Sequence, residues 1–410
     1  MAYVKTNWKD RVVERPNTYT MTNNGNGTVT LTPVPGQIIE RGTPLNAENL
    51  NKIEDAIVET NAQLSAKVNK VRFNIPYEDI NGVNLNEKLE STLNTYKGSN
   101  QLDIRGFNVW KSRDTVYDKG LLEQALKDIE DLNCNTLFIN DRALCRLNGD
   151  KLIEPEFSYP QIEEVISLCK SKGYAVGLKP MLDPENGARF YFQPGTKAPA
   201  FFNELKVHLV ELAKIAARYG VEMLVITSET PQLCHYFYES YWDDVISSIK
   251  AVYSGRLGVD CIYGERLSST SDYDYNCLFE KVDDVMFSFY PKCEYDGSYT
   301  YKDIYDGISK DFQIIHQTSQ RLNKKILLGE TGLAAVQGAL GSGSTGGNVS
   351  PLGEKEQDDY FKALHAIIMD NTNVCSGLMI WDIRLCYPFT QMDIRDKLAF
   401  NTIKRLWSDN

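Results

Sequence analysis

Two glutamates, Glu229 and Glu330, each end a run of branched apolar residues, at 224–228 and 326–329. A continuous apolar run is typical of a strand that is buried on both faces, as in a parallel sheet. A carboxylate at the end of such a strand lies where barrel enzymes keep their catalytic residues. Two carboxylates can cleave a glycosidic bond, because one protonates the leaving oxygen while the other attacks the sugar or activates water. The two glutamates are therefore a candidate catalytic pair.

Polar and aromatic residues lie at or just beyond the ends of the apolar runs, and they are the candidate substrate-binding residues. They are Asn108, Trp110, Lys179, Asp183, Ser228, Tyr290, Trp381 and Asp382. Tyr290 would hydrogen-bond the attacking carboxylate and keep it ionised, or it packs against a neighbouring loop. Trp381 would offer a flat apolar surface to a sugar ring, or it closes the core. No His or Cys spacing predicts a metal site, no phosphate-binding loop follows a strand, and we expect no cofactor.

The elements that would position these residues alternate along the chain from residue 104 onward. Short apolar runs predict strands at 107–110, 136–139, 175–178, 223–227, 257–260, 285–289, 326–328 and 378–381. Helical spacing of apolar residues predicts helices at 121–132, 162–172, 202–219, 245–253, 304–322, 360–368 and 394–407. Eight strands, mostly separated by helices, over ~300 residues predict a (β/α)8 TIM barrel in the α/β class. The fourth and seventh strands would then place Glu229 and Glu330 on opposite sides of one sugar.

A doubly wound open sheet is the alternative arrangement of the same elements. Such a sheet usually carries a glycine-rich turn after its first strand. Residues 108–111 read Asn-Val-Trp-Lys and contain no glycine. The barrel is therefore the favoured prediction.

The first 103 residues follow a different pattern. Residues 18–22 and 28–34 are rich in Thr and Val and flank two Asn-Gly pairs, which predicts a β-hairpin. A helical pattern begins at Asn46, and apolar residues recur every seven positions at 50, 57, 64 and 71. This repeat indicates a short coiled coil, or a helix that packs against a neighbouring domain. We expect a β-rich module at 1–45, a helix and connector at 46–103, and the barrel at 104–410.

The composition excludes several classes of function. The 410 residues carry a net charge of −11, and phosphate backbones repel acidic chains, so we expect no nucleic-acid partner. No apolar stretch reaches the ~18 residues of a membrane span, and the first residues lack the apolar core of a secretory signal. The nine Cys are scattered without Cys-x-x-Cys spacing, which is typical of a chain folded in a reducing cytoplasm.

Several strand-end motifs are similar to those of clan A glycoside hydrolases, and residues 104–410 most resemble glycoside hydrolase family 113. The motifs are Arg105-Gly106-Phe107-Asn108, Gly177-Leu178-Lys179-Pro180, Ile226-Thr227-Ser228-Glu229, Phe287-Ser288-Phe289-Tyr290-Pro291, Gly329-Glu330-Thr331-Gly332 and Ile380-Trp381-Asp382. The resemblance implies that Glu229 is the general acid/base and Glu330 the nucleophile of a retaining hydrolase that acts on β-mannosidic linkages. Two positions depart from the family pattern, since Ser228 stands where many members have Asn and Met181 where the family has His.

The N-terminal segment resembles the start of baseplate or tail proteins of phages that infect Gram-positive bacteria. The similarity covers ~70 residues in three blocks, at 6–16, 27–33 and 42–50. It implies attachment to tail proteins, a homotrimeric association and a place in the virion, with synthesis in the host cytoplasm and action on a polysaccharide of the host surface. The alternative is a baseplate protein that recognises a receptor by binding carbohydrate without cleaving it.

Overall fold

The computed structural model describes residues 9–43, 102–111, 117–262, 276–293, 298–343, 347–386 and 388–408. The chain divides into two units, Met1–Thr92 and Leu93–Asn410. The helix and seven-residue repeat predicted after Asn46 lie outside the described residues, and the three-part division of the chain stays a prediction.

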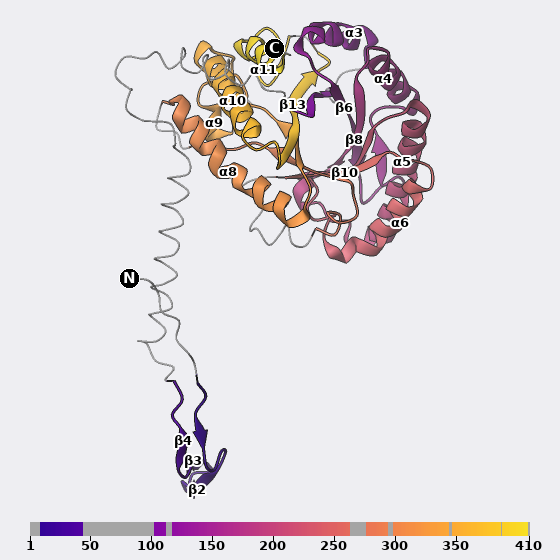
Figure 1. Cartoon of the computed structure of the whole chain (residues 1–410). Coiled ribbons are helices and arrows are strands. Elements are labelled where there is room, and N and C mark those ends of the chain that lie inside the picture. Colours follow the sequence, from indigo (N-terminus) through magenta and orange to yellow (C-terminus); the bar gives the residue numbers. More distant parts are fainter. Residues whose placement is uncertain are drawn as a thin grey trace, which may run out of the picture. The chain divides into compact units, whose positions relative to one another are not determined.

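Eight parallel strands of the described chain form a closed barrel (Figure 1). They are β5 (Ile104–Trp110), β6 (Thr136–Cys145), β8 (Ala175–Pro184), β9 (Met223–Ser228), β10 (Arg256–Ile262), β11 (Asp284–Phe289), β12 (Ile326–Thr331) and β13 (Cys375–Arg384). Each strand pairs with its neighbours in chain order, and β13 pairs with β5 to close the sheet. A short extra strand, β7 (Ile153–Pro155), pairs antiparallel with β6. The predicted (β/α)8 barrel is confirmed, because in an open sheet β5 and β13 would not pair with each other.

Helices surround the barrel and cover its outer face (Figure 1). The longer ones are α3 (Lys119–Asp128), α4 (Tyr159–Ser171), α5 (Ala198–Tyr219), α6 (Glu239–Lys250), α8 (Tyr301–Leu322), α10 (Pro351–Met369) and α11 (Leu398–Trp407). The last helix was predicted from residue 394 but begins at Leu398. The reason is a polar network of Asp393, Arg395 and Lys397, which fixes the chain just before the helix. Among the described residues, no helix combines the length and the apolar character that crossing a membrane requires.

Sequence signals explain how several of these helices begin and end. Thr300 and Asp303 exchange side-chain and backbone hydrogen bonds at the start of α8, which satisfies donors that the first turn leaves free. Gly220 follows α5 with a φ of 64°, a left-handed conformation that glycine adopts without steric cost. The first signal fixes where α8 begins, and the second fixes where α5 ends before β9.

The interior of the barrel is filled by a small apolar cluster of Phe138, Met223, Val225, Met286, Leu327 and Met379. A larger apolar core lies between the strands and the helices. Gly177 shows how tight the interior is, because a β-carbon there would lie 2.5 Å from the ring of Phe138. The barrel is thus a packed core, and the candidate site residues lie toward the carboxyl ends of its strands.

The described part of the N-terminal unit consists of two small antiparallel pairs. Strands β2 (Tyr19–Asn23) and β3 (Val29–Pro33) form the predicted hairpin, and Gly25 and Gly27 in its turn have φ values of 77° and 81°. Strands β1 (Val12–Val13) and β4 (Ile38–Glu40) form the second pair. Side chains of the hairpin strands are exposed on both faces, including Met21 at 70% and Leu31 at 56%.

Candidate active site

Glu330 lies in β12, where a local irregularity of the sheet directs its side chain. The pairing of β12 with β11 skips Gly329, so that Phe287 faces Leu328 and Ser288 faces Glu330. Such a bulge turns the following side chain to a new direction. A β-carbon at Gly329 would lie 2.9 Å from the carboxyl group of Asp260, so glycine makes room for that carboxylate. The Gly-Glu sequence therefore brings two carboxylates from β10 and β12 close together.

A buried lysine joins these two carboxylates. Lys179, on β8, has no exposed surface, and its Nζ lies 2.5 Å from Oε1 of Glu330. The same Nζ forms an ion pair with Oδ2 of Asp260. From the other side, Tyr290 donates a hydrogen bond from its hydroxyl to Oε2 of Glu330, at 3.2 Å. Glu330 thus accepts one donor at each carboxyl oxygen.

The charges in this cluster hold one another in place. Burial opposes the charge of Lys179, but Asp260 and Glu330 outweigh it and raise the pKa of the ammonium. Burial, together with the charge of Glu330, raises the pKa of Asp260 to about 6, although Lys179 opposes the shift. A cation between two carboxylates is required here, because an unpaired buried carboxylate would lose its hydration without compensation.

Glu229 occupies a different environment. It follows β9 with a φ of 55°, a left-handed conformation that is uncommon for a residue with a side chain. Its N–H donates to the carbonyl oxygen of Asp260, at 2.8 Å, which fixes this turn of the backbone. The side chain is 22% exposed, and Nη1 of Arg189 lies 3.6 Å from Oε2. Burial of the carboxyl group and the charge of Glu330 raise the pKa of Glu229 to about 7, although Arg189 opposes the shift.

The two glutamates therefore differ in the chemistry that they can perform. Glu330 accepts a buried cation and a phenol, which suits a carboxylate that attacks as an anion. Glu229 has a pKa of about 7 and can give up or take a proton near neutral pH. Two carboxyl groups in such different surroundings are typical of the division of roles between catalytic residues in enzymes.

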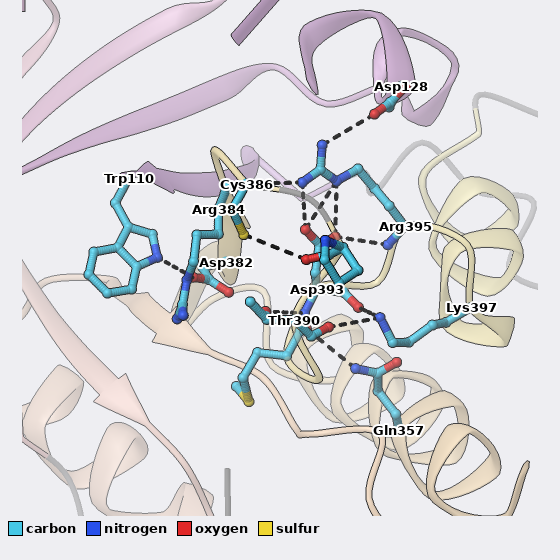
Figure 2. A network of polar contacts seen from close by, with 12 residues as sticks. Trp110, Asp128, Gln357, Asp382, Arg384, Cys386, Thr390, Asp393, Arg395 and Lys397 are labelled. Carbon is cyan, nitrogen blue, oxygen red and sulfur yellow. Dashed lines mark hydrogen bonds and ion pairs between the residues drawn. The ribbon is translucent and has the colours of Figure 1, made fainter. Parts of the chain in front are cut away.

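The aromatic candidates lie on the neighbouring strands β5 and β13. The rings of Trp110 and Trp381 are tilted against each other, with centroids 5.3 Å apart, and both residues are half-buried. Trp110 donates from its indole N–H to Asp382, which also accepts from Arg384 at 3.2 Å (Figure 2). The guanidinium of Arg384 lies 4.4 Å from the Trp110 ring centroid. These contacts fix the orientation of the two indoles.

Figure 2 also shows what holds the segment after β13. Arg395 donates to both carboxyl oxygens of Asp393, with Nη2 2.6 Å from Oδ2, and its Nη1 reaches Asp128 at 3.2 Å. Lys397 donates to the backbone carbonyl oxygens of Thr390 and Asp393. This network ties the loop that follows β13 to α3 and so supports the tryptophan side of the site.

Four residues expected to bind substrate are at most 1% exposed in the structure: Asn108, Lys179, Ser228 and Asp382. The amide of Asn108 donates to the carbonyl oxygen of Gly329 at 3.0 Å and accepts from Asn140 at 3.1 Å. Asn108, Lys179 and Asp382 thus contact the residues around the carboxylates and indoles. Tyr290, Trp381 and Trp110 are half-buried, and they keep surface that a ligand could contact.

Asp183, another expected binding residue, is held by two arginines. Oδ1 accepts from Arg189 at 2.7 Å, and Oδ2 pairs with Arg142. The sequence prediction missed Arg189 because it lies in a short 3-10 helix (Arg189–Tyr191) of the loop after β8, away from any strand end. It also left Asp260 out of the site, although that residue stands near the end of a predicted strand. Within the described residues, no cluster of His, Cys, Asp or Glu has an arrangement that could hold a metal ion.

Comparison with protein families gives one match that spans most of the chain. The family model of Glycoside Hydrolase Family 113 matches residues 108–397, which include both glutamates, Lys179, Asp260 and Tyr290. Among curated proteins, none matches the chain.

Several solved structures share the barrel. The GH113 β-mannanase AaManA from Alicyclobacillus acidocaldarius has a TM-score of 0.59 and 17% identity, over 75% of this chain and 98% of that one. A GH113 β-1,4-mannanase has a TM-score of 0.60 and 18% identity, over 75% and 100%. A β-glucuronidase from Ruminococcus gnavus has a TM-score of 0.51 and 13% identity, over 74% and 49%. At these identities the likeness concerns the fold.

Proposed function

The chain belongs to glycoside hydrolase family 113, and we propose that it cleaves β-mannosidic bonds of a polysaccharide with retention of configuration. Glu330 is the nucleophile and Glu229 the acid/base in this proposal. The observation that carries it is the contrast between the two carboxyl groups. One accepts donors at both oxygens, from a buried lysine and from a tyrosine, while the other has a pKa near 7 and remains partly exposed.

The first step breaks the glycosidic bond. Lys179 contacts Oε1 of Glu330 from within the barrel, so we assign the attack on the anomeric carbon to Oε2, beside the Tyr290 hydroxyl. A bond forms between Oε2 and the anomeric carbon as the bond to the leaving oxygen breaks. Glu229 gives its proton to that oxygen, so the departing sugar leaves as a neutral alcohol.

The second step releases the sugar from Glu330. Glu229, now ionised, accepts a proton from a water molecule, and the water oxygen attacks the anomeric carbon. The ester bond to Glu330 breaks, and its carboxylate returns to Lys179 and Tyr290. Two inversions at the anomeric carbon give overall retention.

Two findings support a β-mannosidic substrate: the family match and the resemblance of the barrel to structures described as β-mannanases. Trp381 and Trp110 offer aromatic surface to a pyranose ring. The departures at Ser228 and Met181 are close in the chain to residues of the site, since Ser228 precedes Glu229 and Met181 follows Lys179 by two positions. Both side chains are buried, at 0% and 3% exposure, so their effect on the sugar acts through packing.

The test is incubation of the full chain with β-1,4-mannan oligosaccharides, matched β-1,4-glucan oligosaccharides and purified wall polysaccharides of Gram-positive bacteria. Mass spectrometry identifies the products, and proton NMR of the first product formed gives its anomeric configuration. We expect shortened mannosides or wall fragments with β configuration. Binding of a glycan without any release of product would support the carbohydrate-binding alternative, and α-configured first products would contradict retention.

We also propose that the N-terminal unit attaches the hydrolase to a phage tail, as part of a homotrimer in the virion. The three similar sequence blocks support this, and so do the exposed apolar side chains of the hairpin, such as Met21 and Leu31. Light scattering of the full chain and of a chain that begins at residue 93 measures the association. A trimer that becomes a monomer on truncation is expected, and a monomeric full chain would contradict the trimer.

A further inference from the structure

A cavity of about 400 Å³ opens beside Glu229. Its charged lining residues are Arg142, Asp183, Glu185, Arg189 and Glu229. They come from β6, from the end of β8, from the loop that follows β8 and, for Glu229, from the turn after β9. Except for Glu229, none of these residues takes part in the proposed catalytic steps, so the cavity calls for an explanation of its own.

Two arginines of this cavity share one carboxylate. Arg189 donates from Nη2 to Oδ1 of Asp183 at 2.7 Å, and Arg142 pairs with Oδ2 of the same group. Arg142 has a second carboxylate near it, since its Nη1 lies 3.9 Å from Glu156. Glu185 is paired with Arg146, at 3.1 Å. Asp183 and Glu185 are therefore already engaged by cations, while Glu229 is not closely paired.

The Nη1 atom of Arg189 is the polar group that remains without a hydrogen bond. It is buried, and no acceptor bonds to it within the described part of the chain. Glu229 approaches it only to 3.6 Å. A buried guanidinium N–H that lacks an acceptor costs free energy. A ligand with an acceptor oxygen in this cavity would therefore be bound favourably.

The position of the cavity indicates which part of a substrate it would hold. A general acid stands on the side of the departing sugar, because it protonates the leaving oxygen. Glu229 lines the cavity directly. If Glu229 is the acid, as proposed above, the cavity lies on the leaving-group side of the bond.

We propose that this cavity is a binding subsite for a departing sugar that carries a carboxylate, with Nη1 of Arg189 as its donor. The subsite rests on the proposed function for its position relative to the cleaved bond. Guanidinium and carboxylate form charge-assisted hydrogen bonds, which are about twice as strong as neutral ones. Asp183 holds Arg189 in place from the other side, so little ordering of the side chain is needed on binding.

Protonation of Glu229 and binding of the anion favour each other. The groups that face Glu229 are Glu330, Asp260, Lys179 and Arg189, and Tyr290 lies close to it as well. Above pH 7 the ionised Glu229 competes for Arg189 and repels an anion. Below pH 7 the protonated Glu229 leaves Nη1 to the ligand. The state that can act as an acid is thus the state that binds the carboxylate.

Titration calorimetry of the full chain with sodium D-glucuronate and with D-glucose tests the subsite without requiring hydrolysis. The two probes differ only at C6, where one carries a carboxylate and the other a hydroxymethyl group. At pH 6 we expect glucuronate to bind at least about tenfold more tightly than glucose. The preference should shrink at pH 8, and in Glu229→Gln it should lose this pH dependence.

Arg189→Gln should remove the preference for glucuronate. Arg218→Gln is the matched control, because Arg218, on α5, pairs with Glu163 of α4 at 2.7 Å and does not line the cavity. Equal binding of both probes by the unaltered chain would overturn the proposal, even if Arg189→Gln failed to fold. An equal loss in both arginine variants would also overturn it. Hydrolysis of β-1,4-mannan oligosaccharides without a glucuronate preference would leave the proposed function standing and remove the subsite alone.

Discussion

The two sides of the site in this barrel are built in opposite ways. Glu330 is 4% exposed and accepts donors at both carboxyl oxygens, from Lys179 and Tyr290. Glu229 is partly exposed, adopts a left-handed backbone and has one loosely placed arginine beside it. Donors at both oxygens keep a carboxylate in one position, whereas a carboxyl group with fewer donors can exchange a proton. One rim of a barrel can therefore hold both a carboxylate with fixed partners and a carboxyl group that exchanges a proton.

Replacing Glu330 should have the largest effect on activity. Glu330→Gln keeps the shape of the side chain but removes the nucleophile, so we expect turnover to fall by at least about a thousandfold. Initial rates on the best substrate of the oligosaccharide panel measure this. The matched control is Glu123→Gln, because Glu123 is an exposed residue of α3. Retention of a tenth of the activity by Glu330→Gln would show that the nucleophile is another group.

Replacing Glu229 should have a large effect that depends on the leaving group. An acid typically contributes about 10²–10⁴-fold, so Glu229→Gln should slow the cleavage of oligosaccharides by this factor. A 2,4-dinitrophenyl glycoside needs no proton on its leaving oxygen, and its first step should be nearly unaffected. The burst of dinitrophenol in stopped-flow measurements follows that step. An equal loss on both substrates would remove Glu229 from the role of acid.

Removing the buried cation should damage the fold as well as the activity. Lys179→Met leaves Asp260 and Glu330 without their counter-charge, and breaking a buried pair typically costs about 3–5 kcal/mol in the free energy of unfolding. Lys206→Met is the control, since Lys206 pairs with the exposed Asp244 at 2.8 Å and should cost at most about 1 kcal/mol. Urea denaturation gives both values. Similar costs for the two variants would contradict the account of the Glu330 side.

The smallest expected effect is the pH dependence that Glu229 creates. Since its pKa is about 7, kcat/KM should fall about tenfold per pH unit above that value, as the acid form is lost. The pKa of Glu229 lies above its ordinary value of 4.5, so the folded chain binds the proton more tightly than the unfolded chain. The free energy of unfolding therefore decreases as pH rises from about 4.5 to about 7. Glu229→Gln should therefore gain stability relative to the unaltered chain between pH 5 and pH 8. A rate that stays constant to pH 9 would contradict this.

The contrast between the two sides also marks what the sequence could predict. Apolar runs that end in polar residues located all eight strands, because burial on both faces leaves a strong local pattern. The same runs placed Glu229 and Glu330 at the carboxyl rim. That pattern carries no information on pairing between distant residues, so Lys179 was expected to bind substrate. Its ion pairs span 81 residues to Asp260 and 151 to Glu330.

Loops were harder to predict than strand ends for a physical reason. The position of Arg189 depends on a short 3-10 helix and on the carboxylate of Asp183, and neither leaves a periodic signal. The irregular pairing at Gly329 leaves no periodic signal either, since it accompanies a close approach of Asp260 from another strand. Sequence patterns thus predict the scaffold and place the two glutamates at its rim, while contacts between elements decide the surroundings of each carboxylate.

Trapping of the covalent intermediate tests the central claim most directly. The full chain is incubated with 2-deoxy-2-fluoro-β-mannosyl fluoride, in which the fluorine at C2 slows both steps and the fluoride leaving group at C1 speeds the first. Intact mass spectrometry should show one added 2-fluoromannosyl group, and peptide mapping should place it on Glu330. No label should form in Glu330→Gln. A label on any other residue, or one that persists in Glu330→Gln, would contradict the assignment of Glu330 as the nucleophile.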